Sequence, residues 1–103
     1  MVTMTKAAAD QVRKSAQEGN LEGLALRLAA KRKDDGSIDY GMGFDEPSEE
    51  DVLFNSEGVK VVVSPAHVHL LNGASMDFVE IAPGEYQFIF LNPNDPHYRP
   101  PTE

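Results

Sequence analysis

The sequence predicts a mainly β domain of the α+β class, with about six strands, an N-terminal helix and one short internal helix. Two long stretches alternate apolar residues with polar or small ones, as half-buried strands do. Shorter apolar runs follow, separated by turns that contain glycine or proline. Two further segments, 6–18 and 65–72, carry helix caps instead. The predicted strands are 24–31, 38–44, 52–54, 59–63, 76–81 and 86–91.

The N-terminal helix is predicted over residues 6–18. Thr5 is a suitable N-cap, and Ala8 and Val12 lie four residues apart on one face. Gly19 is expected to end the helix in the left-handed conformation.

The first hairpin is predicted from two alternating stretches. Leu26 and Leu28 share the buried face of the first strand, and the charged turn 31–35 leads through Gly36 into the second. In that second strand Gly41 and Gly43 share one face, which indicates strong bending or a close backbone approach.

The second half of the chain is predicted to hold an acidic turn, two more hairpins and a helix. The acidic residues of 45–51 are interpreted as a solvated turn, and the turn 55–58 joins the strands that follow. Ser64 and Pro65 mark the start of the internal helix and Gly73 its end. Pro83 and Gly84 join the last two strands.

The size of the chain favours one domain. Its 103 residues are 41% hydrophobic and 25% charged, so a single core is expected over residues 1–94. Four prolines after Asn92 and no apolar period predict a flexible tail over 95–103. No apolar run approaches the ~20 residues of a membrane span, so we expect a cytoplasmic protein without membrane contact.

Charge and cysteine content exclude several functions. The net charge of -8 disfavours nucleic acid as a partner, and only residues 1–33 carry an excess of basic side chains. The chain has no cysteine, which excludes disulfides, thiolate nucleophiles and iron–sulfur or zinc sites built from its own sulfur. We therefore expect no cofactor.

No catalytic pattern is apparent, so an enzyme is not expected. Serine occurs without a nucleophile elbow, and the glycines form no phosphate loop. His67 and His69 point to different sides of the internal helix, one towards the core edge and one to solvent. His97 is interpreted as a solvated tail histidine.

Several strings at ordered spacings resemble the A-type iron–sulfur carrier family, the HesB-like proteins. The resemblance covers about residues 5 to 95 and implies a distorted mixed-sheet barrel with a helix at one end. The strings are Leu26-Arg27-Leu28, Tyr40 with Phe44, Asp45-Glu46-Pro47, Glu50-Asp51, Gly58-Val59-Lys60-Val61-Val62-Val63, Leu71, Gly73, Asp77-Phe78-Val79 and Asn92-Pro93-Asn94.

The resemblance fails at the residues that hold the family's iron or cluster. The family's three cysteines fall at Asp35, Arg99 and Pro101. A hard carboxylate, a permanent cation and a proline cannot replace a thiolate cage. Among cysteine-free relatives, the chain is similar to the paralogue group encoded beside the dissimilatory sulfite reductase system of sulfur-oxidising bacteria.

These observations predict a non-catalytic protein-binding or regulatory protein, accessory to sulfur oxidation and monomeric. The partner is expected to contact the turn 31–35, the tail, or both. The resemblance implies a tail that folds back near this turn, so that His97 could approach Asp34 and Asp35 and offer donors to iron or zinc. The alternative is therefore a weak iron-binding or cluster-assembly accessory that uses Asp35, His97 or a partner's cysteines. The residues expected to contact a protein partner are Lys31, Arg32, Lys33, Asp34, Asp35, His97 and Arg99.

Overall fold

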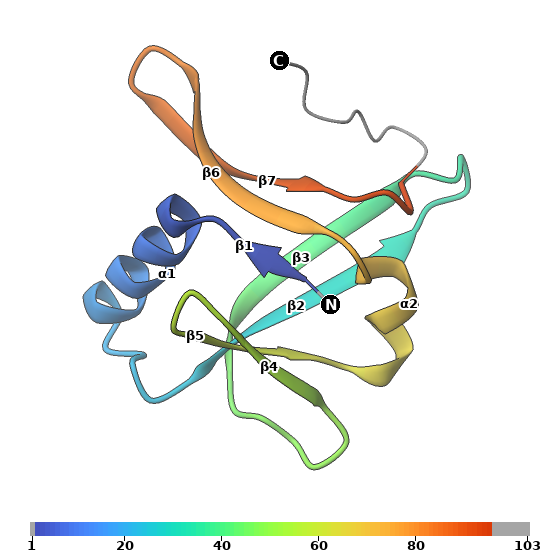
Figure 1. The fold of residues 1–103 in the computed structure, drawn as a ribbon, viewed down its shortest axis with the longest axis horizontal. Helices are drawn as coiled ribbons and strands as arrows, with labels where there is room; N and C mark the ends of the chain where they lie inside the picture. The colour runs from blue at the N-terminus through green and yellow to red at the C-terminus, as the bar shows by residue number, and fades with distance from the viewer. Residues whose placement is uncertain (1, 96–103) are drawn as a thin grey trace.

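The structure, a computed structural model, describes residues 2–95 and contains two mixed β-sheets (Figure 1). Three strands form the first sheet in the order β1-β6-β7, and four form the second in the order β3-β2-β5-β4. The mainly β, mixed-sheet architecture is therefore confirmed. The elements are β1 (Thr3–Met4), α1 (Lys6–Glu18), β2 (Ala25–Arg32), β3 (Ile38–Asp45), β4 (Val52–Ser56), β5 (Val59–Val63), the 3-10 helix η1 (Pro65–His67), α2 (Val68–Leu71), β6 (Ser75–Ala82) and β7 (Glu85–Leu91).

Helix α1 begins and ends as predicted, but the left-handed conformation expected of Gly19 is adopted by the next residue. Thr5 Oγ1 accepts from the Ala8 N–H at 3.1 Å, which satisfies a free donor of the first turn. The left-handed residue at the other end is Asn20, with φ 57°, and Gly19 has φ -94°. Leu21 N–H donates to Ala16 C=O at 2.8 Å, so the end is a Schellman motif centred on Asn20.

Strand β2 lies at the centre of the four-stranded sheet. It pairs antiparallel with β3 and parallel with β5, and Leu26 and Leu28 are each only 1% exposed. The prediction of a close backbone approach at Gly41 and Gly43 is wrong. A Cβ at Gly43 would meet nothing within 4 Å, and one at Gly41 only Ala29 at 3.8 Å. The two glycines instead leave the outer face of the β2–β3 hairpin without side chains at these positions.

The second hairpin is tighter than predicted. Glu57 and Gly58 have φ values of 51° and 81°, and Ser56 pairs directly with Val59. This is a two-residue turn with both central residues left-handed, whose twist suits the flanking strands. Strand β4 therefore runs on to Ser56.

The internal helix is a 3-10 turn followed by one α-helical turn. The Ser64 side chain makes no capping bond, and Gly73 ends the segment with φ 87°, as expected. Strand β1 was not predicted, so the strands number seven and not six among the described residues. It pairs parallel to the start of β6 through Thr3 and Met4. A strand of two residues is too short to show an alternating pattern, and its partner β6 is distant in the sequence.

The core lies between the two sheets and α1. Leu26 and Leu28 are buried as expected, Val61 and Val63 of β5 are buried beside them, and Phe88 is half-buried. Tyr86 is 58% exposed because the tip of the β6–β7 hairpin extends beyond the rest of the fold (Figure 1). Within residues 2–95, neither helix is long and apolar enough to cross a membrane.

Candidate interaction site

The turn 31–35 projects from the end of the β2–β3 hairpin, with all five residues exposed. Lys33 N–H donates to Ser37 C=O at 2.7 Å, and Gly36 turns the chain with φ 88°. Asp35 Oδ1 accepts from the Ser37 N–H at 2.9 Å and from its hydroxyl at 2.5 Å. The turn is thus a fixed structure that borders an open depression shared with Asp39.

Arg32 joins this turn to the chain after β7. Its Nη1 donates to Gly36 C=O at 2.6 Å, and its Nη2 donates to Asn94 C=O at 3.3 Å. The structure therefore brings the turn and residues 92–95 together. His97 and Arg99, the two tail residues predicted to contribute, lie outside the described residues 2–95.

Residues 92–94 are held in place by side-chain amides. Asn92 is 1% exposed, and its Nδ2 donates to Leu70 C=O at 2.6 Å. Its Oδ1 accepts from the Asn94 N–H at 3.0 Å, and Asn94 Nδ2 donates to Asn72 C=O at 2.9 Å. These bonds satisfy carbonyls at the end of α2 and set the direction in which the chain leaves the fold.

Tyr40 lies beneath this segment. Its ring stacks on Phe90 with 4.4 Å between centroids, and its hydroxyl donates to Asp95 Oδ2 at 3.2 Å. Burial raises the pKa of the Tyr40 phenol, and the nearby Asp95 carboxylate contributes. Tyr40 therefore remains a neutral hydrogen-bond donor at neutral pH.

The two helical histidines differ as predicted. His67 Nδ1 lies 2.6 Å from Ala30 C=O and is half-buried, and His69 is exposed. Strand β5 pairs with β2 only as far as Leu28. Beyond that point the His67 ring provides a hydrogen-bond partner for the Ala30 backbone. No group of three or more histidine or acidic side chains within residues 2–95 is arranged to hold a metal ion.

Sequence reasoning missed a network around Arg27. Its Nη1 and Nη2 donate to the two Asp51 oxygens at 2.9 and 2.6 Å, and its Nε donates to Asp45 at 2.7 Å. The Asp51 side chain is 3% exposed, so the solvated turn predicted over 45–51 is wrong for this residue. Hydrogen bonding from Arg27 holds the pKa of Asp51 far below its usual value. The signal in the sequence was weak: Arg27 lies on the polar face of β2 with Lys31, and an acidic run follows later in the chain.

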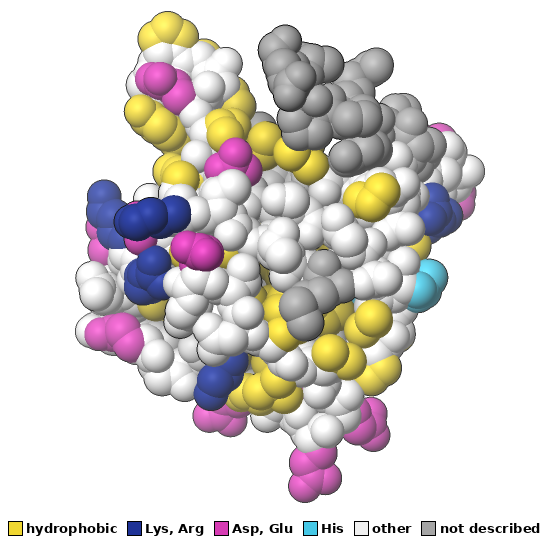
Figure 2. Space-filling model, in the orientation of Figure 1, with side chains coloured by type: hydrophobic (Ala, Val, Ile, Leu, Met, Phe, Trp, Pro, Cys, Tyr) yellow, Lys and Arg dark blue, Asp and Glu magenta, His cyan; other side chains and the backbone are white. Residues whose placement is uncertain are grey.

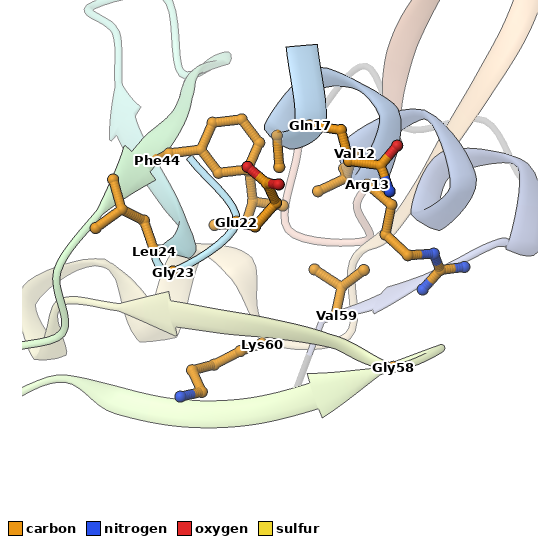
Figure 3. Close-up of a pocket in the computed structure, with 12 residues that line it drawn as sticks. Val12, Arg13, Gln17, Glu22, Gly23, Leu24, Phe44, Gly58, Val59 and Lys60 are labelled. Carbon is orange, nitrogen blue, oxygen red and sulfur yellow. The ribbon is translucent and has the colours of Figure 1, made fainter. Parts of the chain in front are cut away.

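A cavity of about 350 Å³ opens between α1 and the four-stranded sheet (Figure 3). Val12 and Phe44 contribute apolar surface, and Gln17 and Glu22 line it with polar groups. Arg13 Nη1 donates to Glu57 C=O at 2.6 Å, which ties α1 to the β4–β5 turn. This concavity was not predicted, because its walls come from four separate elements.

Comparison with known proteins decides the family. The model of the family described as "Iron-sulphur cluster biosynthesis" matches residues 1–96. The chain belongs to this family.

Individual members of the iron-sulphur cluster biosynthesis family are similar over most of the chain. The iron-sulfur cluster insertion protein ErpA of Xylella fastidiosa (strain M12) is 35% identical over 94 residues, which are 90% of this chain and 73% of ErpA. A protein of Aquifex aeolicus (strain VF5) is 38% identical over 92 residues, 88% of this chain and 78% of that protein.

Solved members of the family share the fold. The crystal structure of IscA with the [2Fe-2S] cluster has a TM-score of 0.76 at 28% identity, covering 90% of this chain and 86% of IscA. Escherichia coli SufA, involved in biosynthesis of iron-sulfur clusters, has a TM-score of 0.72 at 29% identity, with 89% and 80% covered.

The side chains of this protein do not fit an iron–sulfur cluster. Such clusters are held by cysteine thiolates, and the whole chain has none. Asp35 offers only a hard carboxylate, and one of its oxygens already accepts two bonds from Ser37.

Proposed function

We propose that this chain serves iron–sulfur cluster assembly as a non-catalytic protein-binding or regulatory protein that holds no cluster with its own side chains. The observation that carries the proposal is the absence of cysteine from all 103 residues of a chain whose fold is similar to IscA. Without thiolates the fold has no soft metal ligands, but its surface is still available to contact other proteins. A protein-binding role requires only that surface.

The proposed interaction surface is the turn 31–35 together with the tail that follows Asp95. The turn's exposed cations and Asp34 offer both signs of charge to a protein partner. His97 and Arg99 belong to the proposed surface by their place in the sequence. Arg32 is a positioning residue, because its guanidinium donates to Gly36 and Asn94.

We propose a monomer for the isolated protein, since cluster ligation between subunits is not available to it. We propose sulfur oxidation as the process served, on the resemblance to cysteine-free paralogues of that system. The alternative, weak iron binding by Asp35 and His97 or the use of a partner's cysteines, gains no support from Asp35, whose carboxylate bonds to Ser37.

Anaerobic reconstitution with ferrous iron and sulfide, followed by desalting, tests the proposal. The wild-type protein is expected to retain no visible charge-transfer absorption. The matched variant Asp35→Cys/Arg99→Cys/Pro101→Cys restores thiolates at the family positions and is expected to gain that absorption.

A chromophore retained by the wild-type protein would contradict the proposal. Ferrous iron titrated into the wild-type protein and into Asp35→Asn separates the alternative. Saturable binding that is lost in Asp35→Asn would favour weak iron binding by that carboxylate.

A further inference from the structure

An apolar groove lies between β4 and α2. Val52, Leu53 and Phe54 line it from β4, Val68 and Leu71 from α2, and Asn72 follows α2 at the groove. Val52 is 43% exposed, so a large aliphatic side chain faces solvent there, whereas the Leu53 side chain lies on the opposite face of β4 with Val62. Figure 2 shows hydrophobic side chains gathered over β4 and α2. The groove volume of about 170 Å³ is close to the ~150 Å³ that accommodates a benzene-sized group.

Strand β4 is also the free edge of its sheet. Its only strand partner among residues 2–95 is β5. In an antiparallel ladder alternate residues direct their N–H and C=O groups away from the partner, so an edge strand offers donors and acceptors to another strand. Groove and edge coincide on β4, which is the arrangement that strand addition uses.

Exposed carboxylates lie at both ends of β4, with the Arg13 guanidinium beside the one at the far end. Glu49 and Glu50 are exposed and lie just before the strand, and the exposed Glu57 follows it in the turn. The whole chain carries a net charge of -8. A basic segment is therefore complementary to this edge.

These charges disfavour a second copy of the chain as the occupant. Antiparallel pairing of two β4 strands would bring Glu50 of one copy towards Glu57 of the other. Parallel pairing would bring each acidic residue beside its own counterpart. Like charges face each other in both cases, which is destabilising.

We propose that β4 and the groove bind an extended basic segment of another protein. The segment adds to the sheet as a strand, places an aliphatic or aromatic side chain in the groove and directs lysine or arginine towards Glu49 and Glu50. The inference goes beyond the proposed function, because this surface is separate from the turn 31–35 and can be tested without a cluster.

A synthetic heptapeptide, acetyl-Lys-Val-Lys-Leu-Lys-Val-Lys-amide, is the probe, titrated into ¹⁵N-labelled protein. We expect amide shifts concentrated in residues 52–56 and 68–72. Val52→Asp and the milder Val52→Thr should weaken binding, the first by about tenfold or more, as for an interface anchor. Ile81→Asp is the matched control, because Ile81 is 53% exposed on β6, away from the groove.

Two comparisons isolate the edge and the charges. A peptide with N-methylated backbone amides cannot pair as a strand and should lose binding. Glu49→Lys/Glu50→Lys should weaken the lysine peptide and favour a peptide with glutamate in place of lysine, and Glu18→Lys/Glu85→Lys controls for net charge. Shifts elsewhere, equal affinity for the Val52→Asp and Ile81→Asp variants, or undiminished binding of the N-methylated peptide would overturn the inference.

Two other occupants have their own readouts. Dimerisation in sedimentation that disappears in Val52→Asp would assign the groove to a second copy and overturn the inference. Tighter peptide binding after deletion of residues 96–103 would assign it to this chain's own tail and overturn it as well. Substitutions in the turn 31–35 should not change binding of the peptide at β4. This test and the test of the proposed function can therefore fail separately.

Discussion

The guanidinium of Arg27 binds the carboxylate of Asp51 through two parallel hydrogen bonds of 2.9 and 2.6 Å. The Asp51 side chain is 3% exposed and that of Arg27 is 25% exposed. The pair joins the centre of β2 to the residue immediately before β4. It therefore determines how the 45–51 segment returns to the sheet and where β4 begins.

Asp51→Asn is expected to lower the melting temperature of the protein. The substitution removes the charge that Arg27 pairs with and leaves a neutral amide in a nearly buried position. Glu50→Gln is the control, because Glu50 is exposed. Thermal unfolding followed by circular dichroism measures both, and an equal small change in the two variants would contradict the importance of the Arg27–Asp51 pair.

The same pair predicts how stability depends on pH. Asp51 has its pKa lowered in the folded protein, first by its hydrogen bond to Arg27, and Asp45 has its pKa lowered for the same reason. A carboxyl with a lowered folded pKa contributes stability above its unfolded pKa of about 3.9 and loses it as the pH falls towards the folded value. The stability gap between the wild-type protein and Asp51→Asn should thus be constant above about pH 5 and shrink below it. Urea unfolding across that range measures the gap, and a gap that widens in acid would contradict the assignment.

Leu28→Ala should destabilise the fold by ~2 to 5 kcal/mol, because it opens a cavity where β2 meets the rest of the core. Leu28 is 1% exposed. Leu53→Ala is the control and should cost less than about 1 kcal/mol, since half of that side chain is already in solvent. Urea titration gives both values. A cost below about 0.5 kcal/mol for Leu28→Ala would show that its packing is less important than its burial indicates.

Arg32→Ala is expected to loosen the segment 92–95 where Lys33→Ala does not. Arg32 donates to Asn94 C=O, so its removal leaves that carbonyl to solvent and frees the chain beside Tyr40. Hydrogen exchange at the Asn94 amide, which is bonded to Asn92, should accelerate in Arg32→Ala. Unchanged exchange in both variants would show that the asparagines alone hold this segment.

Most of the fold could be predicted because its elements carry local signals. The alternation around Leu26 and Leu28 identifies a half-buried strand, and Thr5 marks the start of α1. Gly73 adopts the positive φ that a chain reversal requires. The errors were also local in origin: the Schellman motif at Asn20 and the two-residue turn at Glu57 use non-glycine residues with positive φ, which composition does not reveal.

The candidate site was predictable only in part. The exposed turn 31–35 follows from its run of charges, and the approach of the chain end to it was expected from the family resemblance. The contact that joins them, from Arg32 to Asn94, depends on two elements at opposite ends of the chain. The groove beside Val52 was not predicted, since the strand signal at 52–54 does not show which face remains uncovered.

The sequence by itself determined most of the secondary structure and the loss of thiolate chemistry, because capping, periodicity and composition are local or global properties that need no coordinates. Only the tertiary structure decided that Arg27 binds Asp51, that Arg32 binds Asn94, and that β1 pairs with β6. It also left the edge and groove of β4 uncovered within residues 2–95. Such contacts join residues far apart in the chain, and they arise from strand register and packing, which no local pattern specifies.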